Sequence, residues 1–119
     1  MQPHHLGDLL QTTPLLRVLR DALPDATLQL VHGRWTRALA SWLRTQGYVD
    51  ALIEYDAAWL HAPGTPWHVR LANERGSRAA AAAALRAAGT DVILDVRCTS
   101  PTALPLARAV PDAWRAGFG

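Results

Sequence analysis

Helix-like and strand-like segments alternate along this chain, and this alternation restricts the fold more than any other feature of the sequence. Apolar residues recur at helical spacing after Thr13-Pro14 and over residues 35–43, and a third helix is predicted over residues 66–88. The strand candidates, which are short and rich in Val, Ile and Leu, are residues 27–32, 51–55 and 91–96. This order predicts an α/β fold, namely a Rossmann-like, doubly wound parallel sheet. A length of 119 residues suits a single domain over residues 1–119.

Proline and glycine mark the expected ends of the helices. A hydroxyl residue at the N-cap and a proline at the first helical position are predicted at Thr13-Pro14, Thr65-Pro66 and Ser100-Pro101. Gly47 and Gly89 are placed to end the second and third helices in the left-handed conformation. The third strand candidate is almost continuously apolar, so we expect it to be covered on both faces.

The start of the sequence does not offer a good first strand. Only six residues precede Gly7, and Pro3 among them removes a hydrogen-bond donor. A doubly wound unit normally has a central strand before its first helix. We therefore expect the sheet to lack most of its first strand.

Charge and cysteine content exclude several classes of protein. The 12 basic residues are all arginine and oppose 10 acidic residues, which leaves a net charge of +2. This thin excess is not the dense basic surface of a nucleic-acid-binding protein, so no nucleic-acid partner is expected. One cysteine, Cys98, excludes an internal disulfide and fits a reducing compartment. With no signal peptide and no bilayer-spanning apolar run visible, we expect a cytoplasmic domain.

The segment beginning at Gly7-Asp8 is the most informative for chemistry. Gly7 is predicted to form a tight strand-to-helix turn, from which Asp8 would project at the carboxyl edge of the sheet, where α/β folds bind ligands. The segment contains neither GxGxxG nor GK[ST], so it is not a dinucleotide fingerprint or a P-loop. An acidic side chain there suits a general base, although the spacing alone slightly favours Asp8 as a simple helix cap.

Several segments resemble one enzyme family in the same order along the chain. GDLLQTTPLLRVLRDALPDATLQLV resembles the opening of the lipopolysaccharide heptosyltransferases, the ADP-heptose-using inverting GT-B enzymes of glycosyltransferase family 9. HGRWTRALAS, YVDALIEYD and GTDVILDVRCTSPTALPLARA are similar to the family's later pieces. WRAGFG is similar to the Arg-x-Gly-aromatic segment that closes the N-terminal half. The resemblance covers nearly the whole chain and implies the N-terminal, acceptor-binding half of a GT-B fold.

The resemblance implies roles for particular residues. Asp8 matches the aspartate regarded as the base that deprotonates the acceptor hydroxyl, and Gly7, Thr12, Thr13 and Pro14 match the surrounding acceptor site. The acceptor is an anionic glycolipid, the inner core on phosphorylated lipid A, which implies a position at the cytosolic face of the inner membrane. Arginine grips phosphate or carboxylate with its planar fork. The best-placed arginines follow the strand candidates, namely Arg97 first, then Arg34 and Arg37, of which Arg37 reads better as a solvated surface charge.

The resemblance also implies what lies outside this sequence. The nucleotide-sugar donor, ADP-heptose, would bind a C-terminal domain that we expect to be missing, so this chain alone should not transfer sugar. No cofactor or metal ligand set is expected within it. Two alternatives remain open, a non-catalytic Rossmann-like binding module and an inert truncated fragment.

The remaining aromatic and polar candidates give weaker signals. Trp59 and Trp67 have rings that suit stacking on a sugar face or an acyl chain, whereas Trp35 and Trp42 fall on an apolar helical face and are predicted to be core. The other polar candidates indicate no specific chemistry. Cys98 is a lone thiol beside an arginine, and Asp95 is a carboxylate that ends a strand. The histidines lack the spacing of metal ligands; they are His4, His5, His61 and His68.

Overall fold

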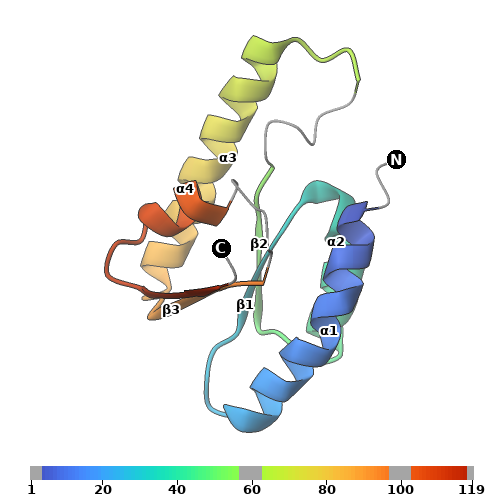
Figure 1. Cartoon of the computed structure of the whole chain (residues 1–119), viewed down its shortest axis with the longest axis vertical. Coiled ribbons are helices and arrows are strands. Elements are labelled where there is room, and N and C mark those ends of the chain that lie inside the picture. Colours follow the sequence, from blue (N-terminus) through green and yellow to red (C-terminus); the bar gives the residue numbers. More distant parts are fainter. Residues whose placement is uncertain (1–3, 57–62, 97–102, 118–119) are drawn as a thin grey trace. The chain divides into compact units, whose positions relative to one another are not determined.

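The chain is described by a computed structural model, which covers residues 4–56, 63–96 and 103–117 and divides into two compact units, Met1–Asp56 and Ala57–Gly119. Each unit contains helices and one pair of parallel strands (Figure 1). The predicted α/β class with parallel strands is therefore confirmed. The strands of the described residues form two two-stranded sheets, β1–β2 and β3–β4.

The first unit is built around a helical crossover between two parallel strands. In chain order its elements are α1 (His4–Ala22), β1 (Gln29–His32), η1 (Arg34–Thr36), α2 (Arg37–Thr45) and β2 (Ala51–Glu54). Residue 29 of β1 pairs with residue 51 of β2, and residue 32 pairs with residue 54. Parallel strands need a long connection, which the short helix η1 and α2 provide.

Leucines from α1 and α2 form the core of this unit. The buried cluster consists of Leu9, Leu16, Ala40, Leu43 and Val49. Leu30 of β1 and Leu52 of β2 pack against it from the sheet. As the sequence predicts, α2 is followed by Gly47 in the left-handed conformation, with φ of 78°. Backbone hydrogen bonds from Gly47 N to Arg44 O and from Tyr48 N to Leu43 O satisfy the last carbonyls of the helix.

The first helix begins ten residues earlier than its proline predicts. We expected the helix to start at Pro14, but α1 starts at His4 and Pro14 lies inside it. Leu9 and Leu16, seven residues apart, share one helical face and are both buried. Burial of Leu9 thus extends the helix across the proline, even though Pro14 cannot donate to the carbonyl of Leu10.

The second unit repeats the helix–strand order. Its elements are α3 (Trp67–Ala87), β3 (Val92–Asp95), α4 (Ala103–Arg108) and β4 (Trp114–Gly117). Residue 92 of β3 pairs in parallel with residue 114 of β4, so partners lie 22 positions apart in both sheets. The predicted third helix and its left-handed stop at Gly89, with φ of 63°, are confirmed. Ser100-Pro101 lies outside the described residues.

Two expectations for this unit, the start of α3 and the burial of β3, are wrong in detail, and one strand was not expected. Pro66 is the N-cap of α3 instead of its first helical residue, and no side chain caps the helix. The sequence predicts that the Thr65 hydroxyl caps the helix, whereas the contact observed is to its carbonyl, which accepts a hydrogen bond from Arg70 Nε at 2.7 Å. Strand β3 is not covered on both faces, because Val92 and Leu94 are exposed while Ile93 between them is half-buried.

Strand β4 is not anticipated by the sequence. Its residues, WRAG, lack a β-branched or alternating pattern, and they form a strand by pairing with β3.

Candidate functional site

The carboxyl ends of β1 and β2 meet at one edge of their sheet. Because the strands are parallel and His32 pairs with Glu54, the residues that follow them, Arg34 and Asp56, emerge side by side. This edge is where α/β folds bind their ligands. The amino-terminal end of α1 lies next to η1, just beyond the end of β1 (Figure 1). The edge and the start of α1 therefore form the candidate site.

Arg34 lies at this edge, as predicted, and forms an ion pair with Asp56. Its Nη2 and Nε donate to Asp56 Oδ2 at 2.8 and 3.1 Å, and its backbone amide donates to Oδ1 at 3.2 Å. The Asp56 side chain is only 14% exposed, whereas half of the Arg34 side chain is exposed. Asp56 thus satisfies the first amide of η1 and one edge of the guanidinium, leaving the rest of that side chain facing solvent.

Arg37 is also engaged, although a solvated surface charge was the favoured interpretation. Its Nε and Nη2 donate to the two carboxylate oxygens of Glu54, each at 2.8 Å. This bidentate pair joins the start of α2 to the end of β2. Exposed ion pairs of this kind contribute about 0–1 kcal/mol, so the pair fixes geometry more than it stabilises the unit.

His32 is the polar residue at this edge that sequence reasoning missed. It ends β1, is 8% exposed, and its Nδ1 lies 2.9 Å from the carbonyl oxygen of Gly33. The sequence signal that could have identified it is a histidine at the end of an apolar strand candidate, because such a position places an imidazole at the carboxyl edge of a sheet.

Asp8 and its neighbours lie in a helix and not in a turn. The predicted strand-to-helix turn at Gly7-Asp8 is wrong, because both residues belong to α1. Thr12 Oγ1 donates to the carbonyl of Asp8 at 2.7 Å, and Thr13 Oγ1 approaches the carbonyl of Leu9 at 3.4 Å. Such back-bonding satisfies threonine hydroxyls within a helix, so neither threonine caps its start. Asp8 itself is exposed near the amino-terminal end of α1, and the role predicted for it stays a prediction.

Other candidates are placed less informatively. Arg97, the arginine favoured for acceptor binding, lies outside the described residues, as do Trp59, His61 and Cys98. His4 and His5 belong to α1. Asp95 ends β3, and His68 is exposed on α3 with its ring edge-on to Trp67 at 6.0 Å.

Two tryptophans that were predicted to be core are half-exposed. Trp35 of η1 is 51% exposed. Trp42 is 48% exposed, because Ala40 and Leu43 occupy the buried face of α2. Trp42 lies against Tyr48, with ring centroids 6.3 Å apart. Trp67 is strongly exposed at the start of α3, which is compatible with the stacking role considered for it.

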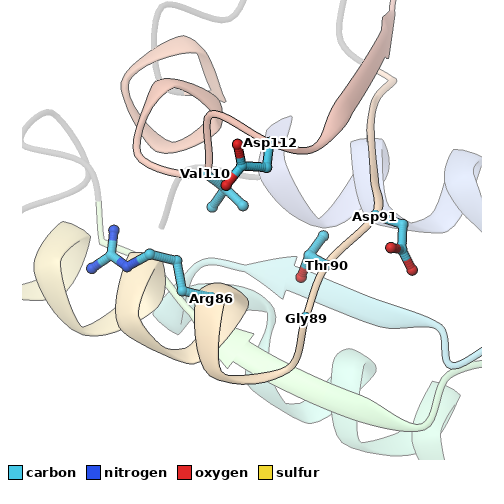
Figure 2. A pocket seen from close by; sticks show the side chains of 6 residues that line it. All are labelled: Arg86, Gly89, Thr90, Asp91, Val110 and Asp112. Carbon is cyan, nitrogen blue, oxygen red and sulfur yellow. The ribbon is translucent and has the colours of Figure 1, made fainter.

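A separate cavity of about 380 Å³ lies in the second unit, between the end of α3 and the start of β3. Figure 2 shows Val110 and Asp112 on one wall, with Arg86, Thr90 and Asp91 around the other side. Arg86 Nη1 donates to the carbonyl of Ala109 at 2.8 Å, and Thr90 Oγ1 donates to that of Leu85. The first hydrogen bond joins the end of α3 to the residue that follows α4, and the second satisfies a backbone carbonyl in the last turn of α3. Of the described residues that were predicted to bind the acceptor, none lines this cavity, which lies at the amino end of β3.

At the opposite end of the first sheet, Asp50 has a structural role. Asp50 Oδ2 accepts hydrogen bonds from Arg20 Nη2 and from the amide of Leu28, each at 2.7 Å. The hydrogen bond from Arg20 is the main reason, and that from Leu28 the second, that the pKa of Asp50 lies below its usual value of 3.8. The network ties the end of α1 to the beginnings of the strands.

Comparison with known proteins adds no assignment: no family model, curated protein or solved structure matches this chain. None of the helices within the described ranges has the length and apolar character needed to cross a membrane. In the same ranges, no three or more histidine, cysteine or acidic side chains are grouped so that they could hold a metal ion.

Proposed function

We propose that this chain is the N-terminal, acceptor-binding half of an inverting GT-B glycosyltransferase of the heptosyltransferase kind. In this proposal the two parallel strand pairs and their helices belong to a Rossmann-like, doubly wound domain. A second domain binds a nucleotide-sugar, ADP-heptose, and the acceptor is an inner-core glycolipid at the cytosolic face of the inner membrane.

The observation that carries the proposal is the segment over residues 7–31, whose likeness to the family opening is the most specific. The segment forms a leucine-rich helix followed by a strand, the same order as in the family. Support also comes from α1, whose amino-terminal end lies next to η1, the short helix that follows the carboxyl end of β1 (Figure 1). Ligands of α/β folds bind at that edge.

Asp8 is the proposed general base. Its carboxylate takes the proton of an acceptor hydroxyl as that oxygen forms a bond to the anomeric carbon of the donor sugar. The bond from the anomeric carbon to the nucleoside diphosphate breaks on the opposite face, which inverts the configuration. Asp8 is exposed and therefore open to an acceptor.

Arg34 and Arg97 are the proposed contacts to the anionic groups of the acceptor, and Gly7, Thr12 and Thr13 the proposed surroundings of the base. Asp56 leaves part of the half-exposed Arg34 side chain facing solvent, so the arginine keeps donors for a phosphate or carboxylate. Glu54 occupies the fork of Arg37, so Arg37 serves as support for the edge.

The test compares two aspartate substitutions in the two-domain protein, in which this chain is joined to a donor-binding domain. Two such domains together have a mass of roughly 30–40 kDa. Asp8→Asn should lower kcat for heptose transfer by about 10²–10⁴-fold, the usual contribution of a positioned base, and leave donor affinity unchanged. Asp21→Asn is the matched control, since Asp21 is exposed on the same helix far from its start. Normal turnover by the Asp8 variant would overturn the assignment of the base. Absence of heptose transfer by the unsubstituted protein would overturn the function.

A further inference from the structure

His32 is one of two polar residues, with Thr36, that are buried among the described residues. It is the last residue of β1, directly before Gly33 and η1, and so lies at the candidate edge. Burial of an imidazole is unfavourable unless its nitrogens find hydrogen-bond partners. The partners of its two nitrogens therefore indicate what the residue does.

One nitrogen has a fixed role. Nδ1 lies 2.9 Å from the carbonyl oxygen of Gly33, and a carbonyl oxygen can only accept. A hydrogen bond here needs the proton on Nδ1, and in that tautomer of the neutral ring Nε2 carries a lone pair. Among the described residues, only Gly33 contacts the ring through a hydrogen bond. Nε2 is thus an acceptor held in a fixed orientation.

The charges around His32 limit which chemical groups of a ligand Nε2 can contact. The two arginines near the end of β1, Arg34 and Arg37, are each paired with a carboxylate, Asp56 and Glu54 respectively. The ion pairs balance the charge of this edge. A lone pair on Nε2 repels the oxygens of a phosphate or carboxylate and attracts a neutral O–H donor.

We propose that Nε2 of His32 accepts a hydrogen bond from a hydroxyl of the sugar acceptor, which makes His32 an acceptor-binding residue. This inference rests on the proposed function and adds to it a contact that selects a neutral hydroxyl. Asp8 removes the proton of the reacting hydroxyl, and His32 holds another hydroxyl of the same sugar.

Two substitutions test the roles of Nδ1 and Nε2 separately. In His32→Asn the amide nitrogen replaces Nδ1 and can still donate to Gly33, but nothing replaces Nε2. In His32→Gln the amide oxygen reaches the position of Nε2 as an acceptor, but the bond to Gly33 is lost. A residue that serves only the fold would tolerate asparagine and lose stability with glutamine, with no effect on sugar binding.

The probe is a deacylated, water-soluble lipid A that carries inner-core sugars, titrated into the 119-residue chain and followed by NMR and by thermal melting. His32→Asn should weaken its binding by about 3- to 10-fold, the size of one hydrogen bond between uncharged groups, with a melting temperature close to that of the parent. His32→Gln should melt lower yet bind more tightly than His32→Asn. Unchanged binding by His32→Asn would overturn the inference while leaving the proposed function intact.

A second measurement does not depend on substitution. In the free chain the nitrogen shifts of His32 should show a protonated Nδ1 and an unprotonated Nε2, and the probe should move the Nε2 signal. The exposed His68 provides the reference in the same sample. A protonated Nε2 in the neutral ring would overturn the inference. Failure of the unsubstituted chain to bind the probe would overturn both the inference and the proposed function.

Discussion

Replacing Gly117 with alanine should separate β4 from β3. A Cβ at this position would lie 2.8 Å from the backbone oxygen of Asp95 and 3.1 Å from its Cβ. Gly117 pairs with Asp95 at the end of the ladder, so the clash falls on backbone that cannot rotate away. Overpacking of this kind typically costs about 1–3 kcal/mol. We expect Gly117→Ala to lose stability in that range.

The matched control is Gly76→Ala in the same unit. Gly76 lies in the interior of α3, and a Cβ there would meet no atom within 4 Å. Alanine should therefore stabilise the helix by about 0.5–1 kcal/mol, so the two substitutions act in opposite directions. Urea denaturation followed by circular dichroism measures both, and the amide signals of β3 and β4 locate the change. If Gly117→Ala were as stable as the parent, the parallel register of β3 and β4 would be wrong.

Two further substitutions test the first unit. Pro14→Ala should raise the stability by about 1–3 kcal/mol in the same denaturation assay, because it restores a donor inside α1; no gain would favour a helix that begins at Pro14. Asp50→Asn should cost about 0.5–1 kcal/mol at pH 7, since the pair with Arg20 is partly exposed. The pKa of Asp50 is lowered in the folded chain, so its contribution is present above about pH 4 and lost as the pH falls further. Melting curves between pH 7 and 3 should converge for parent and variant; a constant difference would contradict this.

The ends of helices were more predictable from the sequence than their beginnings. Gly47 and Gly89 adopt the left-handed conformation that a helix stop requires, a local property that a glycine signals by itself. The start of α1 depends instead on where Leu9 finds a core, which is a tertiary contact. Pro14 was therefore a misleading signal, because packing prevailed over the local cost of proline in a helix.

The candidate site was predictable only in part, for a related reason. The positions of Arg34 and Arg37 after β1 follow from the strand pattern, and both lie at the expected edge. Their partners are Glu54, the last residue of β2, and Asp56, which follows that strand, so only the register of the sheet reveals the pairs. The orientation of His32 likewise depends on a single backbone carbonyl.

The equal spacing of the two strand pairs has a consequence for how the chain opens. Partners are 22 positions apart in both sheets, so closing either loop costs nearly the same entropy. The difference between the pairs must then come from their side chains. Leu30 and Leu52 pack on a core in the first pair, whereas every residue of β4 is exposed in the second. We therefore expect the β3–β4 ladder to open first in local unfolding, while the edge that carries His32 stays formed.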